Sequence, residues 1–314
     1  MLACIATLSL GISSTAMAAD IDAVDLFVGN FAGVASLDFD KLASNQMIND
    51  VISKNAPASA TDDIFNELKA AGIDYKKDID TVAIAVDEKG HACTAIDGKK
   101  SLKDAMDYEA KKNNYTASDY NGVSILTDGK FSVVLLNDKR ILACENKIDI
   151  KPMIDNAKAD KPKLLKDRDS VIYKAFQATD KKADIRFGGK MTKYLKDKSK
   201  SYKLDNAEKK SIAVSDIDSG SVSISFAKGM EVSMIAVAKS DAIAAQGAAI
   251  INETLASMLD EQMLNDMGIG FVKKAISVAA DKKNVNAKVK FNDSEMTTLM
   301  ALLGGMAGGA PAKK

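Results

Sequence analysis

The sequence contains no tryptophan, one histidine and four prolines among its 314 residues. Because proline is so scarce, rigid turns are rare, and we expect long regular elements joined by Gly, Asn and Asp turns. The single histidine, His91, is the only candidate base for a Ser-His-Asp triad. It lies beside Gly90 at a predicted turn and no G-x-S-x-G motif accompanies it, so we assign it no catalytic role.

An excess of charge of either sign is also missing, since 43 basic residues balance 43 acidic ones. This balance gives no indication of a nucleic-acid partner. No phosphate-binding loop or dinucleotide fingerprint occurs, and no His/Cys cluster has zinc spacing. Acid pairs occur at Asp38/Asp40, Asp78/Asp80 and Asp216/Asp218, but none continues into a calcium-binding loop. We therefore predict no cofactor, no metal and no catalytic residue.

The N-terminal segment is apolar and uncharged from Leu2 to Ala18 and ends in Ala16-Met17-Ala18. This pattern is typical of a secretory signal, and we predict a signal peptide over residues 1–18. The mature chain is then exported, to the periplasm or the extracellular space, and has no second apolar run of spanning length. Two alternatives stay open: a membrane anchor, or lipidation at Cys4 if translation starts upstream.

Two cysteines remain after removal of the signal peptide, Cys93 and Cys144. In an exported chain such a pair is compatible with one disulfide, which would contribute roughly 4 kcal/mol by closing a long loop. The alternative is two buried thiols that pack as small apolar residues. Both segments are strand-like, and the sequence does not show whether the strands are neighbours.

A repeated sequence feature organises the chain. Asp78-Ile79-Asp80 and Asp216-Ile217-Asp218 each precede a strand, a turn and a second strand. Both halves follow the order β-α-β-β-α-β-β-α, with one extra helix and one extra strand in the first half, so we predict an internal duplication. The predicted parts are a first unit (19–160), a lysine-rich linker (161–182), a second unit (183–303) and a flexible tail (304–314).

The predicted fold class is α+β, with an antiparallel sheet in each unit and helices packed on one face of it. The β-α-β-β-α-β core resembles the ferredoxin-like arrangement. That arrangement hosts many functions, so the resemblance implies no activity.

Basic residues are concentrated in residues 181–210, which contain eleven Lys or Arg and four Asp or Glu. Lys193, Lys196 and Lys200 have helical spacing and would share one face. One interpretation is contact with an anionic surface, such as lipid headgroups or a cell-wall polymer. The other is an exposed helix that lysines keep in water.

Methionines gather in the second half, and they suggest an apolar cavity for a lipid-like ligand. A plain packed core is the alternative interpretation. The residues concerned are Met230, Met234, Met258, Met263 and Met267.

These features favour an exported, non-enzymatic protein that works by binding or assembly, with a protein or an anionic cell-envelope surface as partner. A carrier of an apolar or lipid-like ligand is the alternative. A hydrolase that uses carboxylates alone is a weaker one, because it needs two acids facing each other across a cleft.

Overall fold

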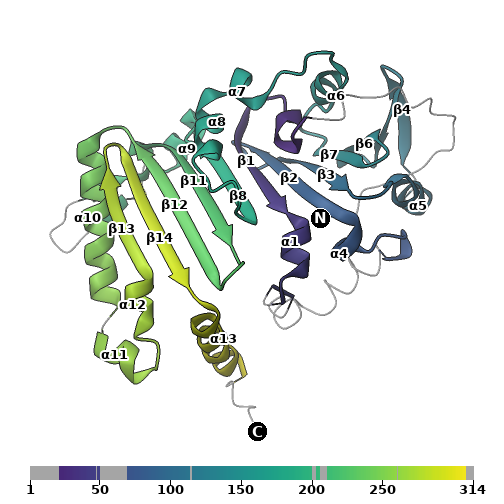
Figure 1. Cartoon of the computed structure of the whole chain (residues 1–314). Coiled ribbons are helices and arrows are strands. Elements are labelled where there is room, and N and C mark those ends of the chain that lie inside the picture. The colour runs from purple at the N-terminus through teal and green to yellow at the C-terminus, as the bar shows by residue number, and fades with distance from the viewer. Residues whose placement is uncertain are drawn as a thin grey trace, which may run out of the picture. The chain divides into compact units, whose positions relative to one another are not determined.

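A computed structural model describes residues 21–46, 48–49, 69–113, 115–199, 203–205, 211–259 and 261–308. The signal peptide predicted over residues 1–18 lies outside these residues. The chain divides into two compact units, Met1–Phe176 and Gln177–Lys314, which we call unit 1 and unit 2 (Figure 1).

Unit 1 contains an antiparallel sheet in the strand order β1-β2-β3-β7-β6-β5-β4. Turns with glycine in the left-handed region, such as Gly90 and Gly129, join consecutive strands. The strands are β1 (Phe31–Asp38), β2 (Ile79–Asp87), β3 (Ala92–Gly98), β4 (Thr116–Tyr120), β5 (Val123–Thr127), β6 (Phe131–Asn137) and β7 (Arg140–Glu145).

Helices cover both faces of this sheet, where we predicted one face only. Side chains alternate along each strand, so Leu142 joins one core with Met153 and Ile154, while Ile141 joins the other with Leu102. The helical elements are η1 (Ala23–Leu26), α1 (Phe39–Ser44), α4 (Tyr75–Asp78), α5 (Lys103–Asn113), α6 (Lys151–Lys158), α7 (Leu165–Arg168) and α8 (Ser170–Gln177).

The segment predicted as a linker, residues 161–182, is instead largely part of unit 1. It forms α7 and α8, whose Leu165, Ile172 and Phe176 are buried in the same core as α6. The prediction relied on the lysine-rich composition and was wrong, because these three apolar residues, although few, are all buried in the core.

Unit 2 contains an antiparallel sheet in the order β8-β11-β12-β14-β13. A separate two-stranded sheet pairs β9 with β10. The strands are β8 (Ile185–Lys190), β9 (Lys203–Asp205), β10 (Ser211–Ala213), β11 (Ile217–Ser225), β12 (Met230–Ala238), β13 (Ile276–Asp281) and β14 (Asn284–Phe291).

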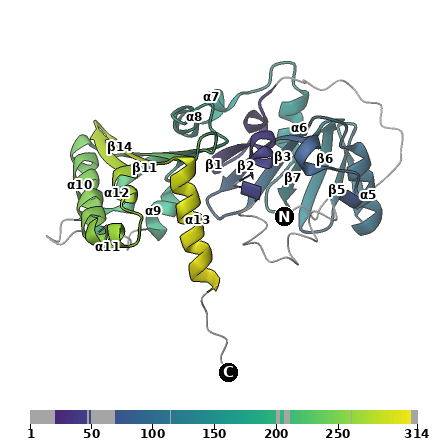
Figure 2. The ribbon, with the colours of Figure 1, turned by 60° about the horizontal axis from the view of Figure 1, so that its bottom comes forward.

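The helices of unit 2 lie on one side of its sheet (Figure 2). The longest, α10, begins after Ser240, whose hydroxyl accepts a hydrogen bond from the backbone N–H of Ile243. The tail predicted from residue 304 is helical as far as Gly308. The helical elements are α9 (Lys193–Lys198), η2 (Val214–Asp216), α10 (Asp241–Met258), α11 (Glu261–Asp266), α12 (Phe271–Ala275) and α13 (Asp293–Gly308).

The strand order of unit 2 repeats in unit 1, where β1-β2-β3-β7-β6 corresponds to β8-β11-β12-β14-β13. Strands β4 and β5 are the additional pair of unit 1. The ferredoxin-like arrangement is not found, because β1 pairs antiparallel with β2 and β8 with β11. In a split β-α-β unit, the two strands joined by the helix run parallel to each other, and another strand lies between them.

The repeated Asp-Ile-Asp has the same structural role in both units. The carbonyl oxygen of Asp78 accepts a hydrogen bond from the backbone N–H of Lys99 (2.8 Å), and that of Asp216 accepts one from Lys239 (3.0 Å). Each motif also carries a β-bulge directly after its isoleucine. In each unit, the repeat therefore lies where the start of the first hairpin is hydrogen-bonded to the residue that follows the hairpin and leads into the next helix.

Candidate functional surfaces

The only histidine closes a turn. Nδ1 of His91 lies 2.9 Å from Oδ2 of Asp87, and the backbone N–H of His91 donates to Oδ1 of the same carboxylate. Although partial burial acts in the opposite direction, hydrogen bonds from His91 and from the backbone of Lys89 hold the pKa of Asp87 below its usual value. These contacts all lie within the β2–β3 hairpin, and they give His91 a structural role there.

Each of the three acid pairs contains at least one aspartate that forms an ion pair with a lysine. Nζ of Lys100 lies 2.8 Å from Oδ2 of Asp78, and Nζ of Lys239 lies 2.9 Å from Oδ1 of Asp216. In the part of the chain that the structure describes, no three His, Cys, Asp or Glu side chains gather closely enough to hold a metal ion. These aspartates therefore act at the ends of strands, where their charges are matched.

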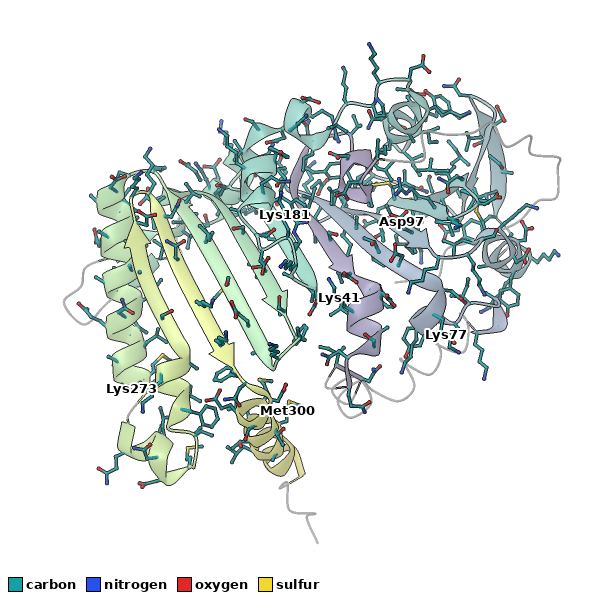
Figure 3. The ribbon with its side chains drawn as sticks, viewed as in Figure 1. Lys41, Lys77, Asp97, Lys181, Lys273 and Met300 are labelled. Carbon is teal, nitrogen blue, oxygen red and sulfur yellow. A yellow bond between two sulfur atoms is a disulfide. The ribbon has the colours of Figure 1, made fainter. Side chains whose placement is uncertain are left out.

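Cys93 on β3 and Cys144 on β7 are directly opposite each other in the sheet of unit 1. Cys93 and Cys144 form a disulfide with an S–S distance of 2.11 Å, and both are fully buried. Met153 from α6 packs beside it, with its sulfur 4.0 Å from that of Cys144. The bond therefore joins two central strands inside the core of unit 1, on the sheet that also carries Asp97 (Figure 3).

The lysine face predicted on residues 193–200 is only partly formed. Helix α9 ends at Lys198, and Lys200 lies outside the described residues. Lys193 is exposed, but Nζ of Lys196 lies 2.7 Å from Oδ1 of Asp218. Lys198 instead places its Nζ 5.7 Å from the ring centroid of Tyr194. Among the described residues, α9 therefore presents an exposed surface of Lys193, Tyr194 and Lys198.

The methionine group lies mainly at the surface. Met258 is 68% exposed, Met263 49%, Met234 40% and Met267 38%, while Met230 is partly buried. Both interpretations of the sequence, a cavity and a packed core, place these side chains inside the protein, and only the tertiary structure of unit 2 shows that most of them are exposed. Large exposed apolar side chains concentrate in unit 2, where Phe187, Tyr194 and Val214 are the others, against Val171 alone in the described part of unit 1.

Among the described residues of unit 2, the one buried apolar cluster is small, although Ile250, Leu264, Phe291 and Met296 are also buried. This cluster consists of Ala238, Ala244, Ala248 and Val285, with partly buried neighbours such as Ile243 and Ile251. Unit 1 buries Phe27, Leu142, Met153 and many others in two clusters. Small side chains allow α10 to approach the sheet closely but remove little apolar area from water.

One apolar row runs across three adjacent strands of unit 2. Phe187 on β8 is paired with Val222 on β11, which is paired with Met234 on β12. Met234 lies on the same face of β12 as Ala236 and Ala238, because these residues are two and four positions further on. Ala238 belongs to the buried cluster with α10 and Ala236 packs against it, so the row lies on the helix-bearing face. Phe187 and Met234 are each about two-fifths exposed, which leaves this row partly uncovered.

Comparison with known proteins shows the fold alone. No protein-family model matches the chain, and no curated protein matches it. The chain is similar to the crystal structures of TP0453 in crystal form IV, with a TM-score of 0.51, and crystal form III, with a TM-score of 0.50. The identity is 8% in both comparisons, which cover 90% of this chain and 97% and 98% of the respective TP0453 chains. This likeness supports the mixed α+β class.

Within the described ranges, no helix combines the length and the apolar character that crossing a membrane requires.

Proposed function

We propose that this protein is an exported, non-enzymatic binding protein, with unit 1 as its stable frame and unit 2 as its binding part. The supporting observation is the contrast between the units. Unit 1 has two large buried apolar clusters and a buried disulfide, whereas the described residues of unit 2 form one small buried cluster and expose Phe187, Met234, Met258 and Met263. Exposed apolar side chains grouped in one part of a protein favour an interaction surface.

A binding experiment tests whether unit 2, rather than unit 1, carries the binding surface. The mature protein from residue 19 is immobilised and exposed to proteins of its own cell envelope, and bound partners are quantified. A variant with Met258→Gln and Met263→Gln is compared with Val171→Gln, which alters an exposed apolar residue of unit 1. We expect the unit 2 variant to lose partners that the control keeps. Equal retention by both variants, or a hydrolytic activity abolished by one Asp or Glu substitution, would contradict the proposal.

A carrier of an apolar or lipid-like ligand is the second candidate, and the row Phe187–Val222–Met234 is the observation that favours it. Such a ligand would lie on the helix-bearing face of the unit 2 sheet. Native mass spectrometry of the gently purified protein distinguishes the two functions. A non-covalent mass that disappears on denaturation, and that Met234→Gln no longer retains, supports the carrier; a bare mass for the parent protein supports the surface-binding function.

A further inference from the structure

The described methionines are distributed unequally between the two units. In unit 1, Met106 and Met153 are both buried. In unit 2, four methionines are among the large apolar side chains that are exposed: Met234, Met258, Met263 and Met267. Among the side chains that the structure describes, no leucine or isoleucine of unit 2 is comparably exposed. The exposed apolar surface of unit 2 therefore consists mainly of methionine.

Three of these methionines lie close together in the chain, where α10 ends and α11 follows. Met258 is the last residue of α10, and Met263 lies within α11. The backbone N–H of Met267 donates to the carbonyl oxygen of Met263, at 3.0 Å, so these two residues are one helical turn apart. We call Met258, Met263 and Met267 the methionine patch.

Methionine differs from the other apolar residues because an oxidant can add one oxygen atom to its sulfur. When the oxidant is a peroxide, its O–O bond breaks, one oxygen bonds to the thioether sulfur, and the other leaves as water. The sulfur loses two electrons, and the peroxide gains them. The product, methionine sulfoxide, is polar, and reductases convert it back to the thioether. A methionine surface therefore has an apolar form and a polar form.

No described thiol competes with these thioethers for an oxidant. Cys93 and Cys144 are joined in a disulfide and fully buried, so neither provides the thiolate that reacts with a peroxide. The rate of oxidation at each methionine then depends on its exposure to solvent. Met258 is the most exposed of the four, whereas Met153 and Met296 are buried. The methionine patch is therefore the favoured site of oxidation over the buried methionines.

We propose that the methionine patch is a site of sulfoxide formation by peroxides, and that its oxidation weakens binding through unit 2. The proposal rests on the proposed function, because it regulates the surface to which we assign binding. Apolar side chains favour docking because their contact removes apolar area from water. A sulfoxide opposes docking because its polar oxygen would be buried without a hydrogen-bond donor.

Peptide mass spectrometry after exposure to hydrogen peroxide tests the site. The protein from residue 19 is sampled over time, and sulfoxide is quantified at each methionine. We expect Met258 and Met263 to be oxidised at least about tenfold faster than Met153 and Met296. Met296 is the matched control, because it is buried in the same unit as the patch. Equal rates at Met296 and Met258 would overturn the assignment, since oxidation would then not follow the exposure seen in the structure.

A leucine variant separates oxidation of the patch from oxidation elsewhere. Met258→Leu, Met263→Leu and Met267→Leu together keep the surface apolar but remove its sulfur atoms. Anilinonaphthalene sulfonate, a dye that fluoresces on exposed apolar surface, is the probe. Peroxide should lower the fluorescence of the dye with the parent but not with the leucine variant. Equal loss with both proteins would overturn the proposal, because the change would then arise outside the patch.

The binding experiment described above tests the effect on partners. Peroxide should release bound envelope proteins from the immobilised parent but not from the leucine variant. Partners that stay bound after the patch is fully oxidised would overturn the regulation and leave the proposed function intact. If the untreated parent captures no partner, the proposed function fails, whereas the oxidation rates and the dye measurement still decide whether the patch changes its character.

Discussion

Arg140 on β7 and Asp97 on β3 form an ion pair with two hydrogen bonds, one from Nε and one from an Nη nitrogen of the arginine. The other Nη nitrogen donates to the carbonyl oxygen of Ile21, at 2.8 Å. Arg140 therefore ties the first described residues of the chain to the centre of the unit 1 sheet. Its side chain is 11% exposed and that of Asp97 is 20% exposed, so the pair is largely removed from water.

Loss of Arg140 should destabilise unit 1 strongly. Arg140→Met leaves the Asp97 carboxylate buried without its cation and the Ile21 carbonyl without its donor, so we expect a loss of about 3 kcal/mol in unfolding free energy. Urea denaturation can be followed by tyrosine fluorescence, because five of the seven tyrosines lie in unit 1 and the chain has no tryptophan. The double variant Asp97→Leu with Arg140→Met removes both charges and should lose less than Arg140→Met. A larger loss in the double variant would contradict this account.

The disulfide should account for a large part of the stability of unit 1. Its cysteines are 51 residues apart, and the entropy of closing such a loop corresponds to about 4 kcal/mol. Cys93→Ala with Cys144→Ala should lower the urea midpoint, and added reductant should change the midpoint of the parent but not of the variant. Equal midpoints for oxidised parent and variant would show that the bond adds no stability.

Two hairpin glycines provide a matched pair for testing backbone contacts. Gly90 and Gly229 both have left-handed φ angles, +90° and +93°, in the first hairpin of their units. A Cβ at Gly90 would meet nothing within 4 Å, but a Cβ at Gly229 would lie 2.1 Å from the carbonyl oxygen of Phe291. Alanine should therefore cost about 1 kcal/mol at Gly90 and at least about 2 kcal/mol more at Gly229.

Circular dichroism melts of the two variants measure this difference. Gly90→Ala reports the cost of the left-handed conformation alone, whereas Gly229→Ala adds the displacement of β14 from the hairpin. Similar losses at both positions would mean that Phe291 moves aside easily.

Asp25 should make stability depend on pH. Desolvation by burial raises the pKa of Asp25 above its ordinary value, although a hydrogen bond from the backbone of Leu165 acts against this. A raised pKa in the folded state favours the protonated form, so its contribution is present below about pH 4 and is lost as pH rises through the folded pKa. An asparagine side chain at this position would imitate the protonated carboxyl and still accept the hydrogen bond. In thermal melts, Asp25→Asn should therefore gain stability relative to the parent between about pH 4 and about pH 7; a constant difference across that range would contradict this.

Local features of the fold could be predicted because they depend on residues close in sequence. Ser240 caps α10 through its own hydroxyl, and the Asp-Ile-Asp motifs precede paired strands in both halves. The α+β class follows from the same alternation of strand and helix patterns. The assignment of residues 161–182 largely to unit 1 could not be predicted in this way. Leu165, Ile172 and Phe176 become core residues only because they share a buried cluster with residues of α6.

The residues that form the candidate binding surfaces could be identified only from the tertiary structure. Lys196 has the same local context as Lys193, but only the packing of α9 against the start of β11 brings Asp218 to within 2.7 Å of it. Methionine spacing alone cannot separate a buried stripe from an exposed one, and only the tertiary structure shows that Met258 is exposed.

The sequence by itself determined the α+β class and the hairpin that follows each Asp-Ile-Asp motif, because backbone conformation and side-chain periodicity are local properties. Strand register, which joins Cys93 to Cys144 and Phe187 to Val222 and Met234, was decided only by the tertiary structure. Register depends on contacts between residues far apart in the chain, and a shift of one residue reverses the face of every side chain.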